Sequence, residues 1–353
     1  MSFKRVILLI LSFSIIVGAV GCSSREAENP DAPDSSQVAA TIGSQKITKD
    51  EFVFYLKNAK RDMEQLSGVY GKEESVIKKF WETKVAGEDP MATAKEKSLN
   101  ALKELKILLT HAKSQNLKLD QQSLDKIKAH MDSIVKDHGK GDQKKADKFT
   151  QETYGIKFSQ YEAIYKDYVL AYEIFVKKFK QDLNIPDKEI SDYYNNNKKT
   201  YDRVIAKHVL ISTVDSEEKE LPQAKLDEKK KLAEDILQKA KIGTDFESLV
   251  KQYSEDPGSK DKGGQIQAAR GRTVKEFDQW LFSAKDGDFG LVKTKYGYHI
   301  IKYIKRTTFD DVKLEIKEEL ENQKYNAKIE EWLKDPNYTV KPNKKLIDSI
   351  SVL

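Results

Sequence analysis

Two histidines lie at the centres of two segments in which apolar and polar residues alternate. His208 stands in the segment IAKHVLIS, and His299 stands in YGYHIIKYI. Alternation of this kind predicts β-strands with one buried face. A buried imidazole does not ionise freely, because burial disfavours its charged form. The two imidazoles could act as direct catalysts or form a hydrogen-bonded structural pair, and the residues alone leave both roles open.

The segment that the two histidine strands enclose predicts a compact α+β unit. The expected order is strand, helix, helix, strand, helix, strand, strand over about one hundred residues. Its elements are the strand 203–212, helices within 222–243, 244–254 and 273–282, strands near 266 and 286–294, and the strand 297–304. The strand that opens the unit and the strand that closes it could therefore lie side by side in one sheet.

Long amphipathic helices are expected on both sides of this unit. Thr48 and Glu51 form a capping-box signature after a short predicted strand at 38–43. The apolar face of the helix that follows is expected to contain Phe52, Leu56, Ala59, Met63 and Leu66. A tyrosine and phenylalanine stripe at 161–179 predicts core, with a clamp for extended polypeptides as the alternative. His111, His130 and His138 stand among charged residues and are expected to be solvated.

The N-terminus predicts export and lipid attachment. Lys4 and Arg5 precede a 15-residue apolar run, VILLILSFSIIVGAV, which is typical of a signal peptide and short for a membrane span. The only cysteine, Cys22, follows this run in the motif AVGC. This motif resembles the lipobox of bacterial lipoproteins, with Cys22 as the lipidated residue; the alternative is a secreted protein with a free thiol. A polar tether follows to residue 37.

The composition argues against several other classes of protein. One cysteine forms neither an internal disulfide nor a zinc site, and we expect no metal or cofactor. Removal of Lys4 and Arg5 with the signal peptide would lower the formal net charge from +5 to +3. The remaining charges alternate in sign, whereas nucleic-acid binding calls for a basic stripe with stacking aromatics.

The α+β unit resembles the parvulin-type peptidyl-prolyl cis/trans isomerases. The resemblance covers residues 203–305 and includes AKHVLIS, DFESLVKQYSEDPGSKDKGGQIQ and GRTVKEFDQWLF in order. With the lipobox-like motif and a SurA-like start, VAATIGSQKITKDEF, the chain resembles the PrsA family of bacterial foldases. The resemblance implies an α+β fold in which a small antiparallel sheet with surrounding helices is inserted into a mostly helical, discontinuous chaperone domain.

The resemblance also implies roles for particular residues. His208 and His299 would lie beneath the active-site floor, and Asp256 would stand beside the substrate carbonyl. The residues that would line the proline pocket are Ile266, Thr273, Phe277 and Tyr296. Thr273 departs from the methionine that is usual at its position, and GGQIQ departs from the usual GGDLG.

The expected organisation has five parts. They are a signal peptide at 1–21, a lipidated tether at 22–37, chaperone segments at 38–200 and 307–353, and an isomerase domain at 201–306. The expected partners are unfolded exported polypeptides with X–Pro bonds and the extracytoplasmic face of the cell membrane, while a homodimer is left open. The acidic loop STVDSEEKELPQ would repel a phosphate group, so unphosphorylated substrates are expected. A holdase with an inactive isomerase domain and a tethered scaffold for one folded partner are the alternatives.

Overall fold

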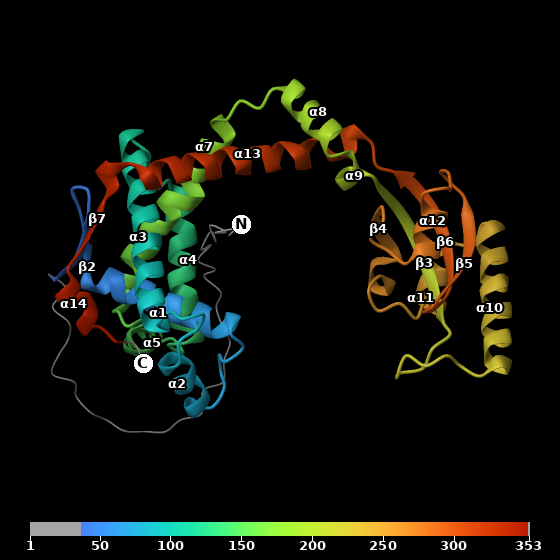
Figure 1. The fold of residues 1–353 in the computed structure, drawn as a ribbon, viewed down its shortest axis with the longest axis horizontal. Coiled ribbons are helices and arrows are strands. Elements are labelled where there is room, and N and C mark those ends of the chain that lie inside the picture. The colour runs from blue at the N-terminus through green and yellow to red at the C-terminus, as the bar shows by residue number, and fades with distance from the viewer. Residues whose placement is uncertain (1–36, 352–353) are drawn as a thin grey trace. The chain divides into compact units, whose positions relative to one another are not determined.

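The computed structural model describes residues 37–351, which divide into two compact units. The sheet unit contains residues 184–323. The helical unit contains residues 37–183 and 324–351 (Figure 1). Cys22 and the predicted signal peptide lie outside the described residues. Within residues 37–351, every helix is too short or too polar to span a lipid bilayer.

The sheet unit is built on four antiparallel strands in the order β4-β3-β6-β5. The strands are β3 (Arg203–Ser212), β4 (Gln265–Ala269), β5 (Phe289–Thr294) and β6 (Gly297–Arg306), and the helices between them are α10 (Gln223–Lys241), α11 (Phe246–Tyr253) and α12 (Lys275–Leu281). The α+β order predicted from the sequence is confirmed. β3 and β6 pair along their whole lengths, so the two histidine strands are neighbours, as predicted.

The alternation of residues along β3 and β6 gives the sheet two buried faces. One face carries Val209, Ile211 and Ile300 and packs against α10 and α11. The opposite face carries Val204, Ala206 and Ile301 and packs against α12 through Phe277 and Leu281. Because His208 and His299 have the same strand parity as this second set, both imidazoles lie on the α12 side.

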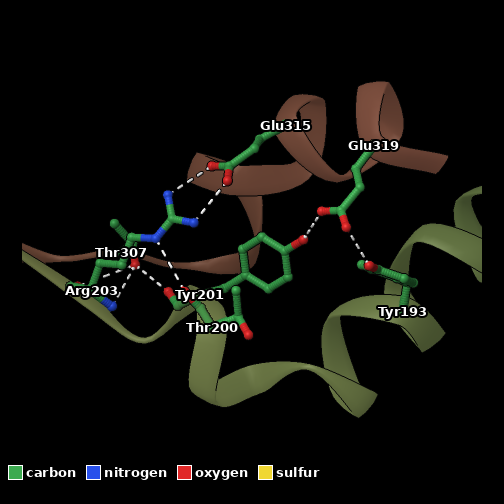
Figure 2. A network of polar contacts seen from close by, with 7 residues as sticks. All are labelled: Tyr193, Thr200, Tyr201, Arg203, Thr307, Glu315 and Glu319. Atoms are coloured by element: carbon green, nitrogen blue, oxygen red, sulfur yellow. Dashed lines mark hydrogen bonds and ion pairs between the residues drawn. The ribbon is translucent and has the colours of Figure 1, made fainter. Parts of the chain in front are cut away.

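Three further helical segments complete the sheet unit where the chain enters and leaves it. They are α8 (Asp187–Asn196), α9 (Lys198–Tyr201) and residues 309–323 of α13 (Phe309–Lys334). Figure 2 shows that the Glu319 carboxylate accepts hydrogen bonds from the hydroxyls of Tyr193, at 2.6 Å, and Tyr201, at 2.7 Å. A hydrogen bond that a hydroxyl donates to a charged carboxylate is stronger than one between two neutral groups. The Glu319 carboxylate therefore holds α8 and α9 against α13.

A second set of contacts in Figure 2 closes the base of β3. The guanidinium of Arg203 donates two hydrogen bonds to Glu315, at 2.8 and 2.9 Å. The hydroxyl of Thr307 donates to the Tyr201 carbonyl at 2.7 Å and accepts from the Arg203 amide at 3.2 Å. The Thr307 amide donates to the Arg203 carbonyl. The entering and leaving strands are therefore joined by both main-chain and side-chain bonds.

The helical unit combines a helical core with a small three-stranded sheet of order β2-β1-β7. Its elements are β1 (Val38–Ile42), β2 (Gln45–Thr48), α1 (Lys49–Leu66), α2 (Glu74–Glu82), α3 (Pro90–Ser114), α4 (Gln121–Asp137), α5 (Gln143–Tyr154), α6 (Phe158–Tyr168), the π-helix η1 (Val169–Val176), α7 (Lys177–Asp182), residues 324–334 of α13, the 3-10 helix η3 (Pro336–Tyr338), β7 (Val340–Pro342) and α14 (Lys344–Ser349). The capping box of Thr48 and Glu51 is confirmed at the start of α1. β7 pairs with β1, and Ile329 and Ile347 join the same core as α1 and α3.

Two predictions for this unit are wrong, and the unit contains one further helix. Leu66 is 79% exposed at the last residue of α1, whereas Glu64 in the same turn is buried against Trp81. The segment before Pro90 contains a helix, α2, anchored by the buried Trp81. The three histidines expected to be solvated instead lie against aromatic rings: His111 stacks on Trp332 at a centroid distance of 3.9 Å, His138 stacks on Phe149 at 3.8 Å, and His130 is tilted by 33° against Tyr165 at 4.2 Å.

Candidate active site

The centre of the candidate site is a direct contact between the two buried histidines. The Nδ1 atoms of His208 and His299 are 3.2 Å apart, and the two ring planes are inclined by 14°. Each residue is 6% exposed. In the register of β3 and β6, His208 lies opposite Ile301 and His299 lies opposite Leu210, so the two side chains meet diagonally on one face of the sheet.

Asp256 is brought to His208 by the loop that follows α11. In this loop the Glu255 amide donates to the Leu210 carbonyl, and the Leu210 amide donates to the Ser254 hydroxyl. These two bonds hold the loop against β3. They place Oδ2 of Asp256 2.9 Å from Nε2 of His208.

The C-terminal end of this loop is bonded to β3 through Gly264. The His208 amide donates to the Gly264 carbonyl at 2.9 Å. Gly264 has a φ of +75°, and a Cβ there would lie 2.5 Å from the His208 carbonyl oxygen. A side chain at this position would therefore push the loop away from His208.

The Asp256 carboxylate is held in its charged form. Partial burial acts to raise its pKa, but hydrogen bonds from the Ser259 hydroxyl and the Gly258 amide, together with His208, outweigh burial and lower the pKa below its usual value. An ionised carboxylate only accepts hydrogen bonds. We therefore assign the proton of the neutral His208 ring to Nε2, which donates to Asp256.

This assignment sets the direction of the remaining bonds in the chain. With its proton on Nε2, His208 accepts at Nδ1 from the Nδ1–H of His299. His299 then accepts at Nε2 from the Thr294 hydroxyl, 2.9 Å away, and the Thr294 oxygen accepts from the Tyr296 amide at 3.2 Å. Every polar atom of the two rings has a partner, so the pair is satisfied while both rings are neutral.

Burial keeps both imidazoles neutral at pH 7. Burial and the neighbouring His208 lower the pKa of His299 to about 3. Burial also lowers the pKa of His208, although the Asp256 carboxylate acts in the opposite direction. The two rings thus form an uncharged, hydrogen-bonded floor.

Phe277 covers this floor from α12. Its ring centroid lies 5.0 Å from that of His299 and 5.6 Å from that of His208, with interplanar angles of 67° and 74°. Ile266 on β4 packs against the same apolar cluster. Four of the predicted site residues therefore form one connected set, in which the two histidines and Phe277 contact one another and Asp256 contacts His208.

The other predicted pocket residues stand at the edge of this arrangement. Tyr296 is 42% exposed and is connected to the histidines through its main-chain bond to Thr294. Thr273 stands immediately before the N-cap residue of α12, and its hydroxyl is buried. Within residues 37–351, no three metal-binding side chains of histidine, cysteine, aspartate or glutamate gather in one place.

Two buried hydroxyls of the site were missed in the sequence. Thr294 could have been found from the alternation along β5, which places it on the same face as Val292 and the histidines. Ser259, which contacts both Asp256 and His208, carries no such signal because it lies in an irregular loop.

The acidic loop after β3 begins beside Tyr296. The Thr213 amide donates to the Tyr296 carbonyl at 3.1 Å, and the Leu221 amide donates to the Thr213 carbonyl. Four acidic side chains stand between these two anchor points: Asp215, Glu217, Glu218 and Glu220. All four are exposed, and although Lys219 pairs with Glu217 and Lys293 lies 3.8 Å from Glu220, acidic groups outnumber basic ones in this loop.

Comparisons with known proteins identify both parts of the chain. Residues 192–307 match the family of PPIC-type peptidyl-prolyl isomerase (PPIASE) domains, and residues 2–175 match the SurA-like N-terminal domain. The chain thus contains a peptidyl-prolyl isomerase domain of the PPIC type and a SurA-like N-terminal domain, as predicted.

Similarity to individual proteins extends over most of the chain. The foldase protein PrsA of Caldanaerobacter subterraneus subsp. tengcongensis is 29% identical over 336 residues, which cover 93% of this chain and 92% of that protein. PrsA of Clostridium acetobutylicum is 27% identical over 354 residues, which cover 95% and 97%. The crystal structure of PrsA from Bacillus subtilis has 23% identity and a TM-score of 0.28, covering 90% of this chain and 94% of that one. The chain is a PrsA-like foldase.

Proposed function

We propose that the chain catalyses the cis/trans isomerisation of X–Pro bonds in unfolded, unphosphorylated polypeptides outside the cytoplasm, with Phe277 and Ile266 against the proline ring. The observation that carries the proposal is the neutral pair His208–His299, satisfied internally and covered by Phe277. An apolar wall above an uncharged floor suits a proline ring, which has no N–H group to satisfy.

The reaction requires only rotation about one bond. The barrier to this rotation is about 18–20 kcal/mol, and the unassisted reaction takes roughly 10–100 s. In the twisted transition state the amide has lost resonance, so its carbonyl is less polarised than in the planar ground state. A site that binds the twisted form better than the planar form accelerates rotation without any proton transfer. In this proposal the histidines hold the floor rigid, and Asp256 sets the electric field at the substrate carbonyl.

The proposal includes the location and organisation of the protein. The isomerase domain, 201–306, would interrupt a chaperone domain made of 38–200 and 307–353. The pairing of β7 with β1 supports a chaperone domain built from both ends of the chain. Lipidation of Cys22 would anchor the protein to the extracytoplasmic face of the cell membrane, because two or three acyl chains anchor firmly where one does not. A homodimer would be compatible with this organisation.

The proposed activity can be tested with the full chain and two matched tetrapeptides. One peptide would carry a Ser-Pro bond and the other a phosphoserine-Pro bond, with the isomerisation rate followed by a protease-coupled assay. We expect acceleration of the first and much weaker acceleration of the second, because the exposed acidic loop next to Tyr296 repels a dianion. Equal acceleration of both peptides would contradict the substrate class, and no acceleration of either would contradict the catalytic proposal.

A further inference from the structure

Thr273 differs from the other side chains around the site in having an unused buried hydroxyl. Among the described residues, the side-chain polar atoms that are buried without a hydrogen-bond partner are Thr273 Oγ1, His111 Nε2 and Tyr325 Oη. His111 and Tyr325 belong to the helical unit, whereas Thr273 belongs to the sheet unit. Thr273 precedes Phe277, which covers both histidines, by four positions.

The local structure does not account for this hydroxyl. α12 begins at Lys275 with Val274 as the N-cap residue, and no side chain caps the helix. Val274 and Phe277 on either side of the helix start pack in the apolar cluster. A buried polar group without a partner costs about 1–3 kcal/mol. Valine has nearly the same shape as threonine and would avoid this cost, so the hydroxyl does not stabilise the free protein through a hydrogen bond.

We propose that the Thr273 hydroxyl is a substrate-binding group that donates a hydrogen bond to the main-chain carbonyl of the substrate proline. This proposal rests on the X–Pro site proposed above. The proline ring itself offers no donor, so the polar groups nearest to a ring in this pocket are the two carbonyls that flank it. A threonine hydroxyl can donate to either of them.

The chemistry of rotation selects between the two carbonyls. The carbonyl of the preceding residue rotates, and it is the better acceptor in the planar amide because resonance increases its polarity there. A bond from Thr273 to that oxygen would stabilise the ground state and oppose catalysis. A bond to the proline's own carbonyl would instead hold the ring still while the preceding residue turns. The inferred contact also depends only on main-chain atoms, which suits substrates of varied sequence.

The experiment compares Thr273→Val and Thr273→Ser in the full chain, using an Ala-Pro tetrapeptide and its analogue with a thioamide in place of the proline carbonyl. We expect Thr273→Val to lower kcat/KM about three- to tenfold, the range of one net hydrogen bond, and to raise the unfolding midpoint. Thr273→Ser should stay within about twofold of the parent, because it keeps the hydroxyl. The thioamide, a weaker acceptor, should slow the parent and leave Thr273→Val unaffected.

Thr307→Val is the matched control. Thr307 is a buried threonine of the same unit whose hydroxyl is fully bonded, as Figure 2 shows, and it lies outside the site. The same substitution there should lower stability and leave kcat/KM of the folded protein unchanged. Unchanged kcat/KM in Thr273→Val, equal losses in the valine and serine variants, or equal thioamide effects in parent and Thr273→Val would each overturn the proposal. If the parent itself does not accelerate isomerisation, the proposed function fails rather than the role of Thr273.

Discussion

Replacing the two buried histidines one at a time and together tests whether the pair is structural. His208→Leu removes the partner of the His299 Nδ1–H, and the Asp256 carboxylate, which reaches solvent, can bind water instead. His299→Leu removes the partners of two buried atoms, His208 Nδ1 and the Thr294 hydroxyl. Both single variants should therefore lose stability, and His299→Leu should lose more.

The loss of stability depends on how many buried polar groups each variant leaves without a hydrogen-bond partner. One buried unsatisfied group costs about 1–3 kcal/mol. For a unit of this size, we expect the unfolding midpoint to fall by roughly 3–10 °C in His208→Leu, and by about twice as much in His299→Leu, where two groups lose their partners. The double variant replaces both rings by apolar groups of similar volume but still leaves the Thr294 hydroxyl without its partner, so stability should be recovered in part, to above that of His299→Leu.

Hydrogen exchange resolved over β3 and β6 measures the local stability, and the tetrapeptide assay measures activity in the same samples. If the pair is a floor that exchanges no proton with substrate, activity should follow the folded fraction in all three variants. A fully folded single variant without isomerase activity would refute this reasoning and make the histidines direct catalysts. Failure of the double variant to recover stability would refute the account of stranded polar groups.

Three further predictions concern the pocket, the pH dependence and the anchor. Phe277→Ala should lower kcat/KM by more than about tenfold, because the wall against the proline ring is lost; suppression of client aggregation should persist, and parallel loss of both activities would contradict separate sites. The folded pKa values of His208 and His299 lie below the ordinary value of 6.5, so the unfolded chain binds more protons than the folded unit. Stability of the parent should therefore fall as the pH is lowered below about 6.5, with a shallower slope in the double histidine variant in urea titrations; equal slopes would count against buried neutral rings. Cys22→Ala should release the mature protein from membranes in a fractionation experiment, and unchanged partition would exclude the lipid anchor.

Regular elements of the site could be predicted because their residues repeat. Alternation along 203–212 and 297–304 gave both strand positions and the face that carries the histidines, and the structure confirms their pairing. Thr294 obeys the same alternation, but a threonine on a strand is too ordinary to be recognised without its neighbour His299. The sequence could not predict that Ser259 belongs to the site, because its position depends on how an irregular loop packs over β3.

The histidines of the helical unit show a second limit of the sequence. His138 stands among charged residues, which favours an exposed position, although it follows the buried Ile134 by four positions. In the structure it lies on α4's C-terminal cap and stacks on Phe149, which belongs to α5. Local periodicity describes one helix at a time, so it carries no information on which ring a neighbouring helix will offer.

The hydrogen bonds at the base of β3 determine which residues an isolated isomerase fragment must include. A fragment cut at residues 201 and 306 would omit Thr307, Glu315 and Glu319, and with them the partners of Tyr201 and Arg203. Tyr201 is 1% exposed in the folded unit, so such a fragment would begin with an aromatic ring that has lost its cover. Transplanting the catalyst into another protein therefore calls for residues 184–323, including the paired helical segments at its root.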